Sequence, residues 1–332
     1  MRCLVTGASG FIGTNFVECM QQSRQELLNL DIAAPQNENG NASWRQCDIL
    51  DRSGLRAAIQ EFQPTHVVHL AARTDTDGKS VEEYRVNTEG TANLLEAVQE
   101  SGSVLRFVHT STQFVHRPGR LPQHDEDFSP HTVYGESKVM AEGLVRKANL
   151  PCVWTIIRPT NIWGPWHPRY PHEFWRVLSK GLYVHPVGKP VIRCYGYVKN
   201  VVFQIRKILE APPEQVHRKV FYVGDRPIEL LDWVNGFARA LTGRNARTVP
   251  KAILQSVALF GDACSLIGVK FPIYSSRLRS MTEDYLTPME PTLAAFGDPP
   301  YTLEEGIRET AEWLKSRGYV KRLYLAPAGT SG

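Results

Sequence analysis

Three glycines in the stretch TGASGFIG, residues 6–13, constrain the fold of this chain more than any other feature. The apolar, strand-like run RCLVT precedes them and an apolar, helix-like run follows them. In such a strand–turn–helix unit, Gly7 permits a tight turn, Gly10 lets the backbone approach a diphosphate, and Gly13 lets the helix pack on the strand. The helix N-terminus, with its free N–H groups and its dipole, favours an anion. The pattern therefore predicts the first unit of a dinucleotide-binding fold.

Asp31 sharpens this prediction because it ends the next strand-like run, ELLNLD, about 18 residues after the last glycine. A carboxylate at this place accepts hydrogen bonds from the ribose hydroxyls of adenosine and repels a 2′-phosphate. We therefore predict NAD as the cofactor. Arg24 and Arg45 leave NADP open as a less favoured alternative.

Apolar runs alternate with helical patterns throughout the first half of the chain, which indicates a parallel sheet covered on both faces. We expect an α/β, doubly wound Rossmann domain over residues 1–160 with a return near 194–226, where KVFYVGD supplies one more strand. Residues 161–193 and 227–320 are expected to form a smaller, mainly helical substrate-binding domain. Its last helix, within YTLEEGIRETAEWLKSRGY, has Thr302 as the expected N-cap. Residues 321–332 are expected to be a loosely ordered tail.

Composition excludes several other classes of protein. The net charge of +4 is small and the basic residues are scattered, which argues against nucleic acid as a partner and is compatible with an anionic small molecule. The six cysteines form no close pair, so we expect reduced thiols in a cytoplasmic protein and no metal site. The apolar stretch 252–269 contains Asp262, and we interpret it as packed helices rather than a membrane span. No membrane partner is expected.

Tyr134 and Lys138 stand four residues apart in TVYGESKVMAE, so a helix there would carry both on one face. A free tyrosine has a pKa of about 10, and lowering it by two to three units takes about 3–4 kcal/mol. One ammonium roughly 4 Å away in a partly buried site supplies about that much. In such a pair Lys138 would lower the pKa of Tyr134, which would then exchange a proton with a substrate hydroxyl. The spacing alone favours an ordinary helix with an exposed tyrosine and lysine, so the prediction depends on the other motifs of the chain.

The chain resembles the extended short-chain dehydrogenase/reductase superfamily, in its NAD-dependent epimerase/dehydratase group. The resemblance covers nearly the whole chain and rests on the order and spacing of modest motifs. Besides Asp31 and Asn87, these are TGASGFIG (6–13), CDI (47–49), HLAA (69–72), TST (110–112), YGESK (134–138), RPTNIWGP (158–165), YVKNVV (197–202) and TLEEGIRETAEW (302–313).

The resemblance implies site residues. Thr112 would be the catalytic hydroxyl residue beside Tyr134 and Lys138, with Ser111 as the near alternative. The implied cofactor-binding residues are Gly7, Gly10, Phe11, Ile12, Gly13, Asp31, Asp48, Ile49, Leu70, Ala71, Ala72, Asn87, Tyr134, Lys138 and Pro159. The implied substrate-binding residues are Thr74, Thr112, Gln113, Asn161, Arg193 and Arg279, with Arg277 as an alternative to Arg279. The group's usual homodimer would use the helices near 88–101 and 134–149.

Departures from the group's motifs narrow the reaction. Family dehydratases carry Asp-Glu after the catalytic threonine, whereas this chain has Gln113-Phe114, so we do not expect dehydratase activity. His116 faces either the substrate or the core, and Asn200 replaces a more usual aspartate. The segment WHPRYPHEFWR, 166–176, is expected to form a lid over the substrate.

Three functions remain open at this point. The first is an epimerase or a reductase acting on a nucleotide-diphosphate sugar, for which arginine forks suit the diphosphate. The second is a dehydrogenase of the 3β-hydroxysteroid type, which the stretch RTDTDGKSVEEYRVNTEGT fits about as well. The third, a non-catalytic NAD-sensing regulator, would not need the proton-exchanging set of Thr112, Tyr134 and Lys138.

Overall fold

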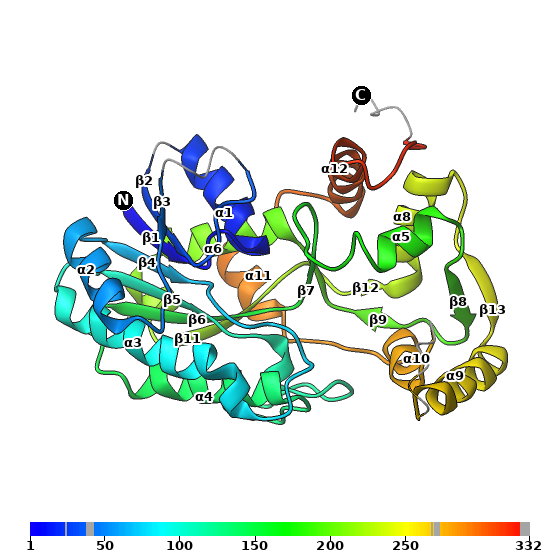
Figure 1. Cartoon of the computed structure of the whole chain (residues 1–332), viewed down its shortest axis with the longest axis horizontal. Coiled ribbons are helices and arrows are strands. Elements are labelled where there is room, and N and C mark those ends of the chain that lie inside the picture. The colour runs from blue at the N-terminus through cyan, green and yellow to red at the C-terminus, as the bar shows by residue number, and fades with distance from the viewer. Residues whose placement is uncertain (24, 38–42, 267, 269–272, 326–332) are drawn as a thin grey trace.

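The computed structural model describes residues 1–23, 25–37, 43–266, 268 and 273–325. A larger lobe consists of one sheet with helices on both faces, and a smaller lobe is built mainly from the second half of the chain (Figure 1).

The sheet of the larger lobe has seven parallel strands in the order β11-β6-β5-β4-β1-β2-β3. The strands are β1 (Arg2–Thr6), β2 (Glu26–Asp31), β3 (Trp44–Gln46), β4 (His66–His69), β5 (Arg106–Thr110), β6 (Val153–Pro159) and β11 (Lys219–Val223). The strand order reverses between β1 and β4, which is where α/β sheets of this kind bind their ligands. The predicted doubly wound fold, including the returning strand at 219–223, is confirmed.

Helices cover both faces of this sheet. On one face lie α2 (Arg52–Phe62), α3 (Arg85–Ser101) and α4 (Val133–Lys147), and on the other lie α1 (Phe11–Gln22) and α6 (Val198–Glu210). Caps fix several starts, because Asp51 accepts from Gly54 N and Thr132 accepts from Gly135 N. Short elements complete the lobe: η2 (Val81–Tyr84), η3 (Gln113–Val115), α7 (Pro213–Val216) and α11 (Glu290–Phe296).

The smaller lobe combines helices with three two-stranded sheets. Its helices are α5 (Phe174–Ser179), α8 (Leu230–Thr242), α9 (Lys251–Leu266), α10 (Ser275–Thr282) and α12 (Leu303–Ser316). Its strand pairs are β7 (Asn161–Trp163) with β10 (Tyr195–Tyr197), β9 (Ile192–Arg193) with β12 (Ile228–Glu229), and β8 (Val184–Val187) with β13 (Arg247–Pro250). The capping box of Thr302 and Glu305 starts α12, so the predicted N-cap is confirmed.

Aromatic residues of the segment 166–176, which is predicted to form a lid over the substrate, pack in the core of the smaller lobe. Trp175 is 1% exposed, and Phe174 stacks on Trp233 with ring centroids 4.8 Å apart. Tyr170 packs edge-on against Trp175 at 5.4 Å. These rings are taken up by neighbouring side chains rather than offered to a ligand, because large aromatic groups stabilise the lobe most when they pack together.

A polar joint connects the two lobes. Asp225, just after β11, accepts from Tyr197 N at 2.7 Å and from Asn200 Nδ2 at 2.8 Å. Asn200 also bonds both the N–H and the C=O of Tyr301, which leads into α12. The amide of Asn200 therefore serves three partners that an aspartate could not serve together, and this explains the departure from the family motif.

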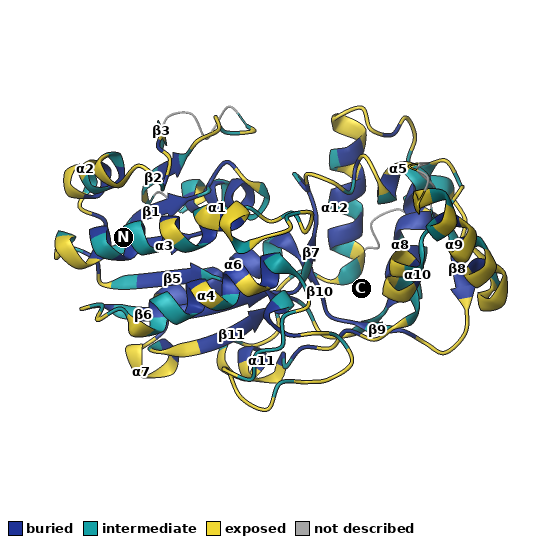
Figure 2. Cartoon of the chain, turned by 60° about the horizontal axis from the view of Figure 1, so that its bottom comes forward, coloured by how far each residue is buried: buried dark blue, intermediate teal, exposed yellow. Residues whose placement is uncertain are grey.

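The end of the chain is only partly described. Tyr324 N donates to Ala240 O at 2.8 Å, so the chain is held against α8 at that point. Residues 326–332, most of the predicted tail, lie outside the described residues. No helix in the described ranges is long and apolar enough to cross a membrane. Figure 2 shows buried residues throughout the central strands and exposed residues on the outer helices.

Candidate active site

The predicted site residues gather where the sheet strands end. The strands are parallel, so their carboxyl ends meet at one edge. Gly7 follows β1, Asp31 ends β2, and Leu70–Ala72 follow β4. Thr112 follows β5 and Pro159 ends β6. This edge is the place where the structure brings the dinucleotide motif and the proton-exchanging residues together.

The glycine turn is packed too closely for side chains. Gly7 has φ +71°, and a Cβ on it would lie 2.4 Å from Ala71 N. A Cβ on Gly13 would lie 2.4 Å from the carbonyl oxygen of Gly7. Helix α1 then begins after Gly10 with no side-chain cap and no acidic residue in its first turn. Its first N–H groups are therefore left for an anion, which fits the diphosphate of a dinucleotide.

Asp31 stands beside this turn, as the sequence predicts. Its Oδ2 accepts from Ser9 N at 2.9 Å and its Oδ1 accepts from Ala33 N at 3.0 Å. Each carboxylate oxygen keeps a second lone pair for a ribose hydroxyl. Arg45 forms an ion pair with Glu61 at 2.7 Å, and Arg24 lies outside the described residues. A carboxylate is therefore the charged group beside the turn, which fits NAD.

Other predicted cofactor residues have different surroundings. Asp48 is exposed, and its Oδ1 accepts from Leu50 N at 2.9 Å. Ile49 is 4% exposed and fits against Gly90 of α3, so its side chain belongs to the core. Asn87 is fully buried and bonds Arg73 N, Arg73 O and Ser137 Oγ. Asn87 thus ties the loop after β4 to helix α4, and its side chain acts through these neighbours.

Thr112 and Tyr134 form the centre of the site. Both are 6% exposed, and Thr112 lies close enough to Tyr134 to lower the pKa of the phenol. Thr112 Oγ1 accepts from Phe114 N at 3.2 Å, so its hydroxyl proton is free to donate to the phenol oxygen. Gly135 explains this closeness, because a Cβ there would lie 2.4 Å from the carbonyl oxygen of Phe114. The start of α4 is therefore pressed against η3.

Burial opposes the predicted acidification of Tyr134 by Lys138, which stays a prediction. Burial raises the pKa of Tyr134 to about 12, although the hydrogen bond with Thr112 and the charge of Arg169 act in the opposite direction. Burial lowers the pKa of Lys138 itself to about 8, against the charge of Glu142. Desolvation of two buried neighbours outweighs the attraction that sequence spacing suggests.

Gln113 and Asn161 pair with each other. Gln113 Nε2 donates to Asn161 Oδ1 at 2.9 Å, and Gln113 is 1% exposed. Its carbonyl oxygen accepts from the hydroxyl of Tyr285 at 3.0 Å. Gln113 Oε1 is buried and has no hydrogen-bond partner among the described residues. That oxygen is the part of the pair that is left to accept a bond from a ligand.

The remaining predicted substrate residues are more dispersed. Arg193 is 6% exposed, donates to Ser280 O and lies 5.9 Å from the ring centre of Tyr285. Arg279 is exposed on α10, and Thr74 is exposed in the loop after β4. His116 is 4% exposed and its Nδ1 lies 3.1 Å from the carbonyl oxygen of Arg117, which fits a residue of the core.

Sequence reasoning missed three contributors. Arg169 is exposed in the smaller lobe, and its charge reaches Tyr134. Phe114 packs against Tyr134 with centroids 6.2 Å apart and gives the site an apolar wall. His69 links β1 to α3 beneath the site: its Nδ1 lies 2.7 Å from Thr6 Oγ1 and its Nε2 lies 3.0 Å from Thr91 Oγ1. The motif HLAA contains this histidine, but nothing in the pattern reveals its partners.

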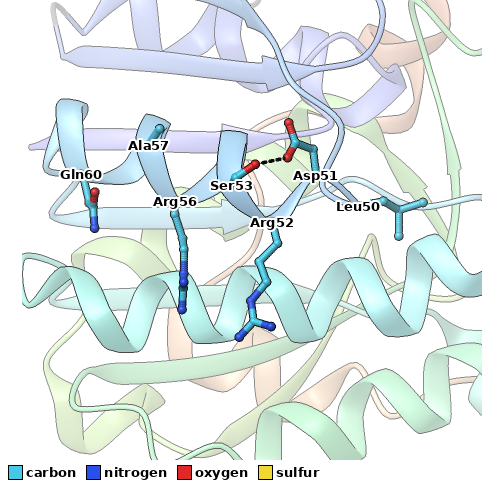
Figure 3. Close-up of a pocket in the computed structure, with 7 residues that line it drawn as sticks. All are labelled: Leu50, Asp51, Arg52, Ser53, Arg56, Ala57 and Gln60. Atoms are coloured by element: carbon cyan, nitrogen blue, oxygen red, sulfur yellow. Dashed lines mark hydrogen bonds between the residues drawn. The ribbon is translucent and has the colours of Figure 1, made fainter.

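A surface hollow of about 580 Å³ lies elsewhere, along α2 (Figure 3). It is lined by Leu50, Asp51, Arg52, Ser53, Arg56, Ala57 and Gln60. Arg52 and Arg56 reach toward α3 and form ion pairs with Glu96 and Glu100. Since it holds none of the predicted site residues, we do not place the active site there.

This fold and this glycine turn are characteristic of Rossmann-type enzymes that depend on a dinucleotide. Residues 3–224 match the NAD dependent epimerase/dehydratase family, so the chain belongs to that family. The predicted family is thereby confirmed, and NAD is the cofactor on which the family depends.

Known relatives support the same assignment. The UDP-glucose 4-epimerase of Vibrio cholerae is 29% identical over 93% of this chain and 94% of its own length. A 3-beta-hydroxysteroid dehydrogenase of Mycolicibacterium neoaurum is 29% identical over 75% of this chain and 71% of its own length. The crystal structure of the Thermus thermophilus UDP-glucose 4-epimerase in complex with NAD is 26% identical, with a TM-score of 0.69 over 95% of this chain and 99% of that one.

Proposed function

We propose that this protein is an NAD-dependent enzyme that oxidises or reduces a secondary alcohol or ketone of a nucleoside-diphosphate sugar, as a 4-epimerase or a ketosugar reductase. The observation that carries the proposal is that Thr112 and Tyr134 are buried together at the dinucleotide edge of the sheet, where Thr112 lowers the pKa of the phenol. The relative from Vibrio cholerae, aligned over nearly the whole of both chains, supports the sugar-nucleotide class. We further propose that the domain limits and the site residues are those predicted from the sequence, and that the protein is cytoplasmic.

Tyr134 exchanges a proton with the substrate oxygen in this function. Since its pKa is raised to about 12, the phenol is protonated near neutral pH and ready to donate to a ketone oxygen. Removing a proton from a hydroxyl needs added positive charge, for which Lys138 and Arg169 are the nearby cations of this chain. Thr112 holds the phenol oxygen in place. Bound NAD supplies the hydride acceptor and, once reduced, the hydride donor.

Elimination of water is not part of the proposal. The amide of Gln113 is held by Asn161, and the ring of Phe114 is apolar. Neither side chain transfers a proton at the position where dehydratases of the family carry an acid and a base. We therefore keep the epimerase and reductase chemistry and leave out the dehydratase chemistry.

A 3β-hydroxysteroid-type dehydrogenase is the second candidate. The apolar wall that Phe114 forms beside Tyr134 favours it, and so does the mycobacterial relative. That relative covers less of the chain than the epimerase does, so we rank this function second.

The test combines binding with turnover. We expect UDP, GDP or dTDP to raise the melting temperature of the purified chain, because a ligand that binds only the folded state stabilises it. We expect one nucleoside-diphosphate sugar to be converted, as followed by NMR, and Tyr134→Phe to lose about 10²- to 10⁴-fold in turnover while NAD still raises its melting temperature. If no nucleotide stabilises the chain and a 3β-hydroxysteroid reduces NAD instead, the second candidate replaces the first. A fully active Tyr134→Phe variant would reject both.

The protein is further proposed to be a homodimer that pairs through α3 and α4. These helices pack side by side on one face of the sheet, and Met140 of α4 is 52% exposed. Light scattering measures the mass in solution, and a monomer at all concentrations would contradict this arrangement.

A further inference from the structure

Helix α9 lies at the end of the smaller lobe, remote from the sheet (Figure 1). Its inner side packs through Leu254 and Ala258 against Leu278 of α10. Its outer side is unlike that of an ordinary surface helix, because the large apolar residues there are exposed. Ile253 is 54% exposed, Leu259 is 66% exposed and Leu266 is 89% exposed.

These residues form a continuous uncharged strip, which we call the apolar face of α9. Its residues recur at helical spacing: Ala252, Ile253, Ser256, Leu259, Phe260, Ala263 and Leu266. Within α9 the one acidic residue is Asp262, which points away from this face, since its Oδ1 accepts from Ser275 N at 3.1 Å. Val187, 55% exposed, extends the apolar surface from β8, which pairs with β13 just before α9.

Basic residues border this face. Residues 233–282 contain seven basic residues and one acidic residue, whereas the net charge of the whole chain is only +4. The rest of the chain is therefore slightly acidic on balance. Lys251 begins α9, and Lys189 follows β8 two residues after Val187; both are exposed, and neither forms an ion pair within the described part of the chain.

The sequence predicts no membrane partner, but the exposed apolar residues of α9 change this expectation. We propose that the apolar face of α9 and its basic border bind the surface of an anionic lipid bilayer, with the helix lying in the plane of the interface. Exposed apolar side chains enter the boundary between headgroups and acyl chains, and Lys and Arg are drawn to acidic headgroups. The helix does not cross the bilayer, because its 16 residues are too few. A second copy of the chain is a poorer partner, because docking two such faces would bring two basic borders together.

The test measures co-sedimentation of the full chain with vesicles. We expect binding to phosphatidylcholine vesicles that contain about 30 mol% phosphatidylglycerol, with weaker binding to phosphatidylcholine alone and weaker binding in about 0.5 M salt. Leu259→Asp places a charge on the apolar face and should reduce the bound-to-free ratio about tenfold. The double variant Lys189→Glu/Lys251→Glu should reduce it by a similar factor on anionic vesicles.

Leu105→Asp is the matched control, because Leu105 is 60% exposed at the sheet lobe. It should bind like the unchanged protein, and all variants should keep the same circular dichroism and melting temperature. Absence of binding to anionic vesicles overturns the proposal, as does equal loss in the Leu259→Asp and Leu105→Asp variants. Self-association that Leu259→Asp abolishes, without any binding to vesicles, would assign the face to a second copy and would also overturn it.

Discussion

At the scale of single residues, the chemistry of the site depends on which hydroxyl holds Tyr134. Ser111 and Thr112 are adjacent in sequence and both are buried. Thr112 lowers the pKa of the phenol, whereas Ser111 Oγ is buried without a hydrogen-bond partner among the described residues. The two hydroxyls therefore have different surroundings, and we propose Thr112 as the one that acts on the reaction.

Thr112→Val keeps the shape of the side chain and removes the donor. We expect kcat/KM to fall about 10²- to 10³-fold, the usual loss when one positioned donor is removed from an active site. Because Thr112 also lowers the pKa of Tyr134 against the larger effect of burial, the basic limb of the pH–rate profile should move to higher pH. Steady-state kinetics across pH measures both effects.

Ser111→Ala is the control for this substitution. It should leave kcat/KM within a few-fold of the unchanged enzyme, because no described partner depends on that hydroxyl. The assignment of Thr112 is rejected if Ser111→Ala is the more damaging of the two substitutions.

The positions of the three glycines and of Asp31 at the turn after β1 can be predicted from the sequence. A tight turn demands glycine, and a ribose contact demands a carboxylate. It does not predict the pKa of Tyr134. The four-residue spacing of Tyr134 and Lys138 says that they share a helix face, but it gives no measure of burial. Burial raises the pKa of Tyr134 and lowers the pKa of Lys138. Tyr134 is buried by the rings of Phe114 and Tyr84 and by the close contact at Gly135.

At the scale of elements, α4 is fixed to the sheet by a buried ion pair. Arg158 of β6 donates to Glu142 twice, with both distances 2.8 Å, and the side chains are 1% and 0% exposed. Arg158 also donates to the hydroxyl of Tyr222 on β11 at 3.1 Å. This arrangement sets the position of the helix that carries Tyr134 and Lys138.

Glu142→Gln leaves the guanidinium of Arg158 buried without a counter-charge. We expect a loss of about 3–5 kcal/mol in the free energy of unfolding, measured by urea denaturation. The double variant Glu142→Leu/Arg158→Met removes both charges and should recover most of that loss, because replacing a buried pair by apolar groups is close to neutral.

Glu126→Gln serves as the comparison, because Glu126 lies in the loop before α4 and pairs with Arg146 of the same helix. Glu126 faces Arg146 at 3.8 Å and is 63% exposed, so its removal should cost less than about 1 kcal/mol. Equal costs for Glu126→Gln and Glu142→Gln would contradict the role given to the buried pair.

The elements themselves were predictable in proportion to their length. The long apolar strands and helix α12 show clear hydrophobic periods, so the sequence predicts them. The pairs β8–β13 and β9–β12 were missed because strands of two to four residues have no visible period. In β8–β13, Val184 pairs with Arg247, so the partner is more than sixty residues away and only the folded lobe brings them together.

At the scale of the whole molecule, the joint around Asp225 connects the sheet lobe to the start of α6 and to α12. Its carboxylate receives two hydrogen bonds, from Tyr197 N and Asn200 Nδ2, but burial dominates and raises its pKa to about 7. The two lobes are therefore joined by a carboxyl group that holds its proton far above the usual pH.

A raised pKa in the folded state makes the stability of the molecule depend on pH. The folded protein binds this proton more tightly than the unfolded chain does, so the contribution of Asp225 is complete below about pH 4 and is lost as pH rises to about 7. We expect this loss to reach at most about 4 kcal/mol.

Asp225→Asn cannot titrate and should remove that slope from the free energy of unfolding, measured by urea denaturation between these pH values. Asp298→Asn is the control. Asp298 is exposed, and its ion pair with Arg226 lowers the pKa of the Asp298 carboxyl, so this substitution should leave the slope in place. If Asp225→Asn and the unchanged protein lose stability in parallel over this range, the titrating group lies elsewhere.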